Sequence, residues 1–202
     1  MSFVSLILTI LKRMKTKIIV LLAAAEVLLA LVSWILSSTT LMAVRSLLSS
    51  EGIRWFLGHY SEIVLTPLLI WILLLSMSYG VIAESHIFSP SGNELERIGR
   101  KAVVGVSLLF IISIAVLVAA PHAILLSATG NLFPSPFSKA LVPIVAFGLL
   151  VCGMVYGLIV RSFEGVNDIV NAMLLGVYKG SYLILIYLLL IQLYESIFFV
   201  FA

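Results

Sequence analysis

Five long apolar runs constrain this chain more than any other feature of its sequence. They cover residues 18–36, 63–83, 102–120, 141–160 and 180–201. A helix needs roughly 20 mainly apolar residues to cross the hydrocarbon core of a bilayer. A lipid-exposed span must also satisfy its backbone hydrogen bonds internally, which favours helices. The sequence therefore predicts an all-α, polytopic integral membrane protein with about five transmembrane helices in a single membrane domain, residues 1–202.

The composition supports a lipid environment and argues against nucleic-acid binding. Apolar residues make up 62% of the chain and charged residues 10%, whereas soluble domains average roughly 45–50% and 25%. The mean hydropathy is +1.25 and the pI is about 9.1. The basic residues lie in short clusters beside the apolar runs, as membrane topology requires, and no nucleic-acid reading module accompanies them.

The distribution of Lys and Arg predicts the orientation. If the amino terminus is cytoplasmic, the inside segments hold eight basic residues: Lys12, Arg13, Lys15, Lys17, Arg97, Arg100, Lys101 and Arg161. The outside segments then hold three: Arg45, Arg54 and Lys139. The positive-inside rule favours this arrangement. We expect a multi-pass protein of a bacterial inner membrane, with the amino terminus inside and the carboxyl terminus outside.

Two further stretches are predicted to be helices that do not cross the bilayer. Residues 46–60 mix bulky apolar and charged side chains, which is typical of a helix lying in the membrane interface. Residues 167–177 carry one apolar stripe and a separate polar face. Gly176 and Gly180 could bend this second stretch into the fifth span, or residues 164–201 could form one long tilted helix. The sequence leaves both possibilities open.

Glu26 is the candidate functional residue within a span. It lies about half way along the first apolar run, where a charged side chain costs roughly 2.5–3.5 kcal/mol on insertion scales. One interpretation is a functional intramembrane carboxylate. The other is a carboxyl group that is protonated, or hydrogen-bonded at a helix contact, for structure alone. Lys179 and Glu195 are about 24 Å apart along the fifth span and are expected to reach separate interfaces.

No arrangement of residues predicts catalysis, a cofactor or a metal site. His59, His86 and His122 belong to different loops, and the predicted topology places His86 across the membrane from the other two. Cys152 is the single cysteine and has no partner for a disulfide or a zinc site. An intramembrane enzyme is therefore the least favoured reading, because no acid, base, nucleophile and metal can be assembled.

Two glycine pairs predict close helix packing. Gly153 and Gly157, and then Gly176 and Gly180, have the GxxxG spacing that puts two glycines on one helix face and lets another backbone approach. These four glycines are candidate packing residues for a tightly packed helix pair or for a subunit contact.

Several segments resemble the p-aminobenzoyl-glutamate (AbgT) transporter family. An early pair comprises residues 46–56, SLLSSEGIRWF, and 73–84, LLLSMSYGVIAE. A later set comprises SPFSK at 135–139, VP at 142–143, GMVYG at 153–157 and DIV at 168–170. The resemblance implies a polytopic helical fold related to these transporters. Members similar to this chain at both places are longer, and their additional blocks hold the re-entrant hairpins and broken helices that bind substrate and coupling cation.

The resemblance thus suggests an AbgT-like scaffold part without the hairpin transport part, and no binding residue of the family is carried over to this chain. The first hypothesis is a membrane scaffold or assembly protein, a homodimer or higher homo-oligomer, that does not transport on its own. The alternative is a subunit of a secondary transporter for p-aminobenzoyl-glutamate-like or other small anionic solutes. Its substrate site would come from a second membrane protein or from the subunit interface.

Overall fold

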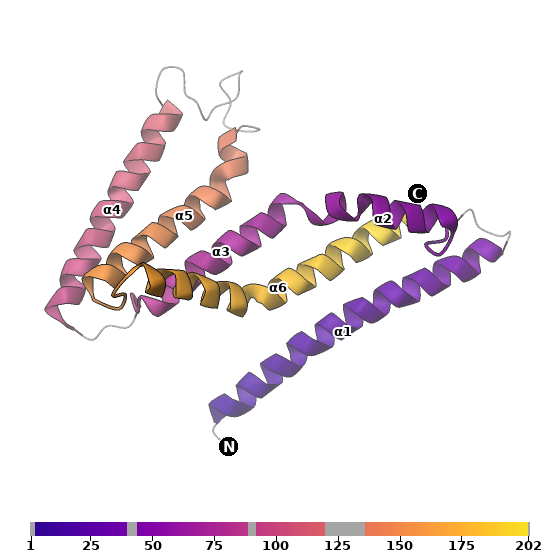
Figure 1. Ribbon diagram of the computed structural model, residues 1–202, viewed down its shortest axis with the longest axis horizontal. Coiled ribbons are helices and arrows are strands. Elements are labelled where there is room, and N and C mark those ends of the chain that lie inside the picture. Colours follow the sequence, from indigo (N-terminus) through magenta and orange to yellow (C-terminus); the bar gives the residue numbers. More distant parts are fainter. Residues whose placement is uncertain (1–2, 40–43, 89–91, 120–135, 202) are drawn as a thin grey trace. The chain divides into compact units, whose positions relative to one another are not determined.

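The structure is a computed structural model that describes residues 3–39, 44–88, 92–119 and 136–201. Helices form all of the regular secondary structure in these ranges, as Figure 1 shows. The six helices are α1 (Phe3–Ser38), α2 (Ser50–Val64), α3 (Pro67–Glu84), α4 (Glu94–Ala119), α5 (Pro136–Ile159) and α6 (Val166–Phe201). The prediction of an all-α membrane protein is confirmed.

Five segments of the described residues are long and apolar enough to cross a membrane. They are Lys15–Ser38, Pro67–Glu84, Glu94–Val118, Phe137–Ile159 and Val166–Phe201. They correspond to the five apolar runs of the sequence. In the third segment, Glu94–Val118, no residue of the most apolar 18-residue stretch is buried within the protein. This is expected of a helix surface that faces lipid rather than a protein core.

The structure decides the question left open about the last third of the chain. Helix α6 runs without interruption through Gly176 and Gly180, so the amphipathic stretch and the fifth span are one helix of 36 residues. Of the two possibilities that the sequence left open, the structure therefore shows one long helix. Apolar side chains on both sides of the two glycines continue the helix, and glycine costs a helix interior only about 1 kcal/mol.

The described contacts divide the chain into two compact units. Unit 1 comprises Met1–Ile70 and Ser181–Ala202, and unit 2 comprises Trp71–Gly180. Helices α3 and α6 each contribute residues to both units. The single membrane domain stays a prediction from sequence.

In unit 1, a short break separates α2 from α3. Ser49 caps α2, and its hydroxyl accepts a hydrogen bond from the Gly52 amide at 3.0 Å. The helix ends at Val64, and Pro67 begins α3, where its missing amide hydrogen costs nothing. The helix expected at 46–60 is therefore present as α2, displaced by four residues, and its place in the membrane interface stays a prediction. The expected second span starts at Pro67 instead of residue 63.

In unit 2, α4 and α5 lie side by side, as Figure 1 shows. Gly148 on α5 faces the ring of Phe110, where a Cβ would come within 3.1 Å of the ring carbon Cδ1. One turn further along α5, the Cys152 sulfur lies 3.3 Å from the Ser107 hydroxyl. Cys152 thus belongs to a helix contact.

Candidate functional site

Glu26 hydrogen-bonds to the last helix of the chain. The Ser196 hydroxyl on α6 donates to Glu26 Oε1 on α1 at 2.6 Å, and both residues belong to unit 1. Ser196 is fully buried. A hydrogen bond to a carboxyl group inside a membrane helix pair removes part of the cost of placing that group in lipid. This bond therefore ties the middle of α1 to α6.

Gln192 extends the contact along α6. Its side-chain amide donates to the Ser196 hydroxyl at 3.2 Å, so an amide, a hydroxyl and a carboxyl group form a chain. Gln192 is 7% exposed. Two oxygens at the ends of this chain, Glu26 Oε2 and Gln192 Oε1, are buried and accept no hydrogen bond from the described residues. We call Glu26, Gln192 and Ser196 the intramembrane polar cluster.

An apolar cavity of about 320 Å³ borders Glu26. Its other lining residues are Val27, Ala30, Leu47, Leu48, Ile53, Phe56 and Leu57, all of unit 1. Among the described residues that line this cavity, Glu26 alone has an ionisable side chain. The intramembrane polar cluster therefore lies beside apolar walls, where an electrostatic interaction is screened less than in water.

The segment before α2 is held against both α1 and α6. The Ser33 hydroxyl on α1 accepts a hydrogen bond from the Leu47 amide at 3.2 Å, and the Arg45 amide donates to the Val200 carbonyl at 3.1 Å. The Trp55 ring stacks on Phe199, with centroids 4.5 Å apart. These contacts hold residues 45–47 and the first turns of α2 against α1 and against the last residues of α6.

A second cavity of unit 1, of about 380 Å³, is lined by charged and aromatic residues. They are Arg45, Glu51, Arg54, Trp55, His59, Glu195, Phe198 and Phe199. Helix α2 therefore presents apolar residues to the first cavity and charged residues to the second, as expected of an amphipathic interfacial helix.

The closest helix contact of unit 2 is made by glycines of α3 and α6. A Cβ on Gly80 would come within 2.6 Å of the Gly176 Cα, and one on Gly180 would come within 2.8 Å of the Ser76 Cβ. Real Cβ atoms do not approach that closely, so neither position has room for a larger residue. The GxxxG pair at Gly176 and Gly180 thus faces α3 of the same chain.

The other predicted pair, Gly153 and Gly157, has two different neighbours. A Cβ on Gly153 would stand 3.0 Å from Val81 Cγ1 on α3. Gly157 lies against the ring of Phe163, in the turn that follows α5. The two glycines of this motif share a helix face, but only Gly153 meets another helix there.

Lys179 forms an ion pair that the sequence analysis did not anticipate. Its ammonium nitrogen lies 3.5 Å from Glu84 Oε1, and the two side chains are 44% and 40% exposed. The sequence analysis expected Lys179 and Glu195 to reach separate interfaces and gave Lys179 no partner. Lys179 meets Glu84 because α6 continues without a break and brings Lys179 beside the end of α3.

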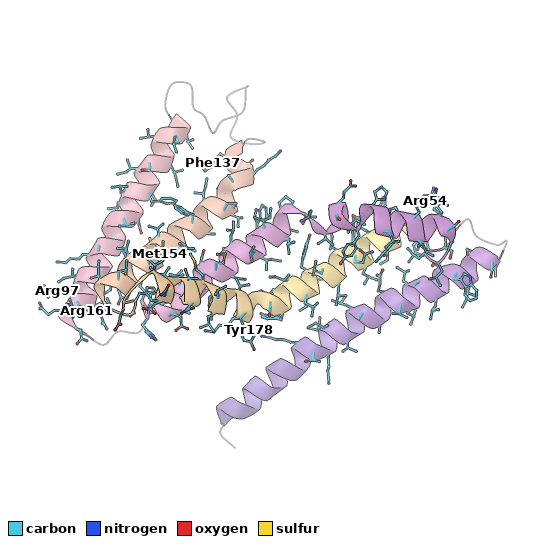
Figure 2. The ribbon with its side chains drawn as sticks, in the orientation of Figure 1. Arg54, Arg97, Phe137, Met154, Arg161 and Tyr178 are labelled. Atoms are coloured by element: carbon cyan, nitrogen blue, oxygen red, sulfur yellow. The ribbon has the colours of Figure 1, made fainter. Side chains whose placement is uncertain are left out.

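A third cavity, of about 480 Å³, lies at this end of unit 2. Its lining includes Glu84, His86, Ser162, Asp168 and Asn171. Figure 2 places Arg97 and Arg161 at the same end of the unit and Phe137 at the other end of α5. That both arginines lie on the cytoplasmic side stays a prediction from sequence. Among the described residues, no three His, Cys, Asp or Glu side chains are grouped to hold a metal ion.

Sequence reasoning singled out Glu26 but not its partners. The available signal was that Gln192 and Ser196 are four residues apart in α6, which places both on one face. Glu195, three residues after Gln192, lines the charged cavity and does not belong to the cluster. His59 and His86 lie in separate units, and His122 lies outside the described residues.

Comparison with known proteins identifies the family. A family model described as the AbgT putative transporter family matches residues 89–195, more than half of the chain. The fold is similar to that of the Alcanivorax borkumensis YdaH transporter, whose crystal structure is described as revealing an unusual topology. The TM-score is 0.71 at 13% sequence identity, over 89% of this chain and 70% of that one. No curated protein sequence matches the chain.

Proposed function

Because the chain belongs to the AbgT putative transporter family, we propose that it is an integral membrane scaffold of that type, which assembles as a homo-oligomer and does not transport on its own. The family match supports a transporter-like membrane protein. The scaffold role is our inference from the way the helices of unit 2 are packed.

The observation that carries this proposal is the contact between Gly80 and Gly176. Backbone atoms of α3 and α6 approach there without intervening side chains, and a Cβ on Gly176 would stand 2.8 Å from the Gly80 Cα. Such interfaces are stabilised by extensive van der Waals contact between backbones. A close-packed pair resists sliding because any shift brings atoms into collision. A rigid pair of this kind suits a fixed frame better than a moving element.

The test is reconstitution of the purified protein into liposomes. A scaffold is expected to form a homo-oligomer of defined mass in mild detergent and to show no uptake of p-aminobenzoyl-glutamate above that of empty liposomes. Uptake by this protein alone would contradict the proposal. The native mass of the solubilised complex also shows whether a second polytopic protein is present.

A second candidate function is a subunit of a secondary transporter for small anionic solutes, with the substrate site supplied by a partner or by the subunit interface. The intramembrane polar cluster favours it, since ionisable residues inside membrane spans commonly mark ion or substrate pathways. It predicts a second membrane protein in fixed ratio after purification. It also predicts that Glu26→Gln abolishes uptake while assembly survives, whereas Glu62→Gln, at an exposed position of α2, leaves uptake intact.

We further propose that the amino terminus is cytoplasmic, in a bacterial inner membrane. The distribution of Lys and Arg supports this orientation. Cysteine labelling of whole cells tests it in a Cys152→Ser background. A membrane-impermeant maleimide is expected to label Arg54→Cys and not Arg97→Cys, both of which replace exposed side chains. The reverse pattern would show the opposite orientation.

A further inference from the structure

The charged cavity of unit 1, of about 380 Å³, contains charges of both signs that are not paired with one another. Its lining brings Arg45 and Arg54 together with Glu51 and Glu195. Among the described residues, none of these four side chains forms an ion pair or a side-chain hydrogen bond. Two guanidinium groups and two carboxylates are therefore available to a ligand in one cavity.

Aromatic rings order this lining. The Trp55 ring of α2 stacks on the Phe199 ring of α6, with centroids 4.5 Å apart. The Arg45 guanidinium carbon lies 5.8 Å from the Phe199 centroid, within the range of a cation–π interaction. Phe199 itself is buried. These contacts hold α2 and the end of α6 together before a ligand binds, which lowers the entropy that binding would cost.

We propose that the charged cavity binds the headgroup of a zwitterionic phospholipid, one that carries a phosphate diester and an ammonium group, as phosphatidylethanolamine does. Arg45 and Arg54 supply donors for the phosphate, since a guanidinium group can bind two phosphate oxygens at once. Glu51 and Glu195 supply acceptors for the ammonium group, which has only donors. Lipid binding goes beyond the function proposed above and does not depend on whether the chain is a scaffold or a transporter subunit.

The balance of charges in the lining favours a zwitterionic headgroup over an anionic one. The formal charges of the two arginines and the two glutamates cancel. An anionic headgroup would pair with the arginines but would be repelled by the carboxylates, whereas a zwitterionic headgroup gives each sign a partner. His59, the remaining ionisable residue of the described lining, forms its own hydrogen bond within α2, from Nδ1 to the Trp55 carbonyl at 3.1 Å.

The surroundings of the cavity favour a lipid over a soluble zwitterion. Arg54 projects from α2 near the carboxyl end of α6 (Figure 2), where Phe198 lines the same cavity and is 64% exposed. Ile53 and Leu57, which line the apolar cavity, are 50% and 72% exposed. An amphipathic helix in the membrane interface exposes its polar face to headgroups and its apolar face to acyl chains. A phospholipid matches both surfaces at once.

Native mass spectrometry of the purified protein in mild detergent tests the choice of headgroup. Phosphatidylethanolamine and phosphatidylglycerol with identical acyl chains are added at equal concentration. We expect bound phosphatidylethanolamine to persist at detergent concentrations that remove phosphatidylglycerol. Retention of phosphatidylglycerol to an equal or greater extent, or of neither lipid, would overturn the proposal, and this comparison requires no variant.

Substitutions of opposite charge locate the lipid in the cavity. Arg54→Gln and Glu51→Gln should each weaken binding of phosphatidylethanolamine by about threefold to tenfold, as expected for charge-assisted contacts of exposed groups. The matched controls Arg97→Gln and Glu62→Gln replace exposed side chains outside the cavity and should leave binding unchanged. All four altered side chains are exposed, so the melting temperature without lipid is expected to stay the same.

The effect of Glu51→Gln also distinguishes the two kinds of headgroup. Removal of this carboxylate weakens the binding of a zwitterion but strengthens the binding of an anion, because a repelling charge is lost. Stronger lipid binding by Glu51→Gln would therefore contradict the proposal. Unchanged binding in both cavity variants would show that the lipid lies elsewhere, which would also contradict it.

A soluble headgroup distinguishes a lipid from a free solute. Glycerophosphoethanolamine carries the same phosphate diester and ammonium group without acyl chains. We expect it to displace phosphatidylethanolamine only at far higher concentration than a competing phosphatidylethanolamine with different acyl chains. Equal potency of the two competitors would mean that the cavity binds a soluble zwitterion, and the assignment to a lipid would be wrong. Because no arm of the experiment measures uptake or oligomer mass, its outcome is separate from that of the test of the proposed function.

Discussion

Gly176 on α6 lies against Gly80 on α3 so closely that a Cβ on either residue would stand within 2.8 Å of the other's Cα. Both residues belong to unit 2. In membranes, helix association depends on van der Waals packing and hydrogen bonds, because lipid tails are as apolar as the helices themselves. The contact is therefore a principal source of cohesion in this unit.

Gly176→Ala is expected to lower the melting temperature in detergent. The added methyl group must push the backbones of α3 and α6 apart, and overpacking of this kind typically costs about 1–3 kcal/mol. Gly105→Ala is the matched control, because a Cβ there meets no described atom within 4 Å. Alanine is the better helix former by about 0.5–1 kcal/mol, so the control should hold or gain stability. Equal melting of the two variants would show that the contact is looser than described.

Tyr187→Phe is expected to destabilise the junction between α2 and α3. The Tyr187 hydroxyl donates to the Val64 carbonyl at 3.1 Å and contacts the Thr66 hydroxyl. Removing the Tyr187 hydroxyl leaves the Val64 carbonyl and the Thr66 hydroxyl without this partner, at a cost of about 1–3 kcal/mol. Thermal unfolding of Tyr194→Phe provides the comparison, since Tyr194 is 61% exposed. A similar melting temperature for both variants would mean that water replaces the hydroxyl.

Ser78→Ala should weaken the contact between α3 and α5. The buried Ser78 hydroxyl lies 2.7 Å from the Ala146 carbonyl and 2.9 Å from the Leu74 carbonyl of its own helix. Hydrogen bonds between membrane helices average about 0.6 kcal/mol, so a small decrease in unfolding free energy is expected. The exposed Ser113 bonds only within its own helix, and Ser113→Ala should leave that free energy unchanged. A larger loss of unfolding free energy in Ser113→Ala than in Ser78→Ala would contradict a stabilising hydrogen bond between Ser78 and the Ala146 carbonyl.

Lys179→Met is expected to change stability very little, although it breaks the ion pair with Glu84. The two side chains are 44% and 40% exposed, and exposed pairs typically contribute less than about 1 kcal/mol. The melting temperature should also respond weakly to added salt. A loss comparable to that in Gly176→Ala would show that this pair contributes as much as glycine packing to the contact between α6 and α3.

The sequence predicted the helices better than their contacts. The apolar runs placed five spans, because the cost of exposing polar groups to lipid sets both the length and the composition of each span. Their ends were less certain, since flanking residues such as those around Pro67 and Lys179 are compatible with either a helix or a turn. Periodicity also could not decide between one long helix and two for residues 164–201.

The candidate site was predicted only in part, because its members are distant in the chain. Glu26 stood out alone, as a carboxyl group in an apolar run is unusual wherever its partner lies. Its bond to Ser196 joins residues 170 positions apart, and no local pattern specifies that distance. Similarly, the spacing of Gly176 and Gly180 indicated a packing face but not that α3 occupies it.

By itself, the sequence determined that this chain is embedded in the lipid bilayer as a set of helices, because hydrophobicity and backbone hydrogen bonding act on each segment separately. Tertiary structure alone decided which polar group meets which: Ser196 with Glu26, and Lys179 with Glu84. The physical reason is that such pairings depend on the rotation and depth of one helix against another. Those quantities follow from the packing of many weak contacts at once, which no single segment encodes.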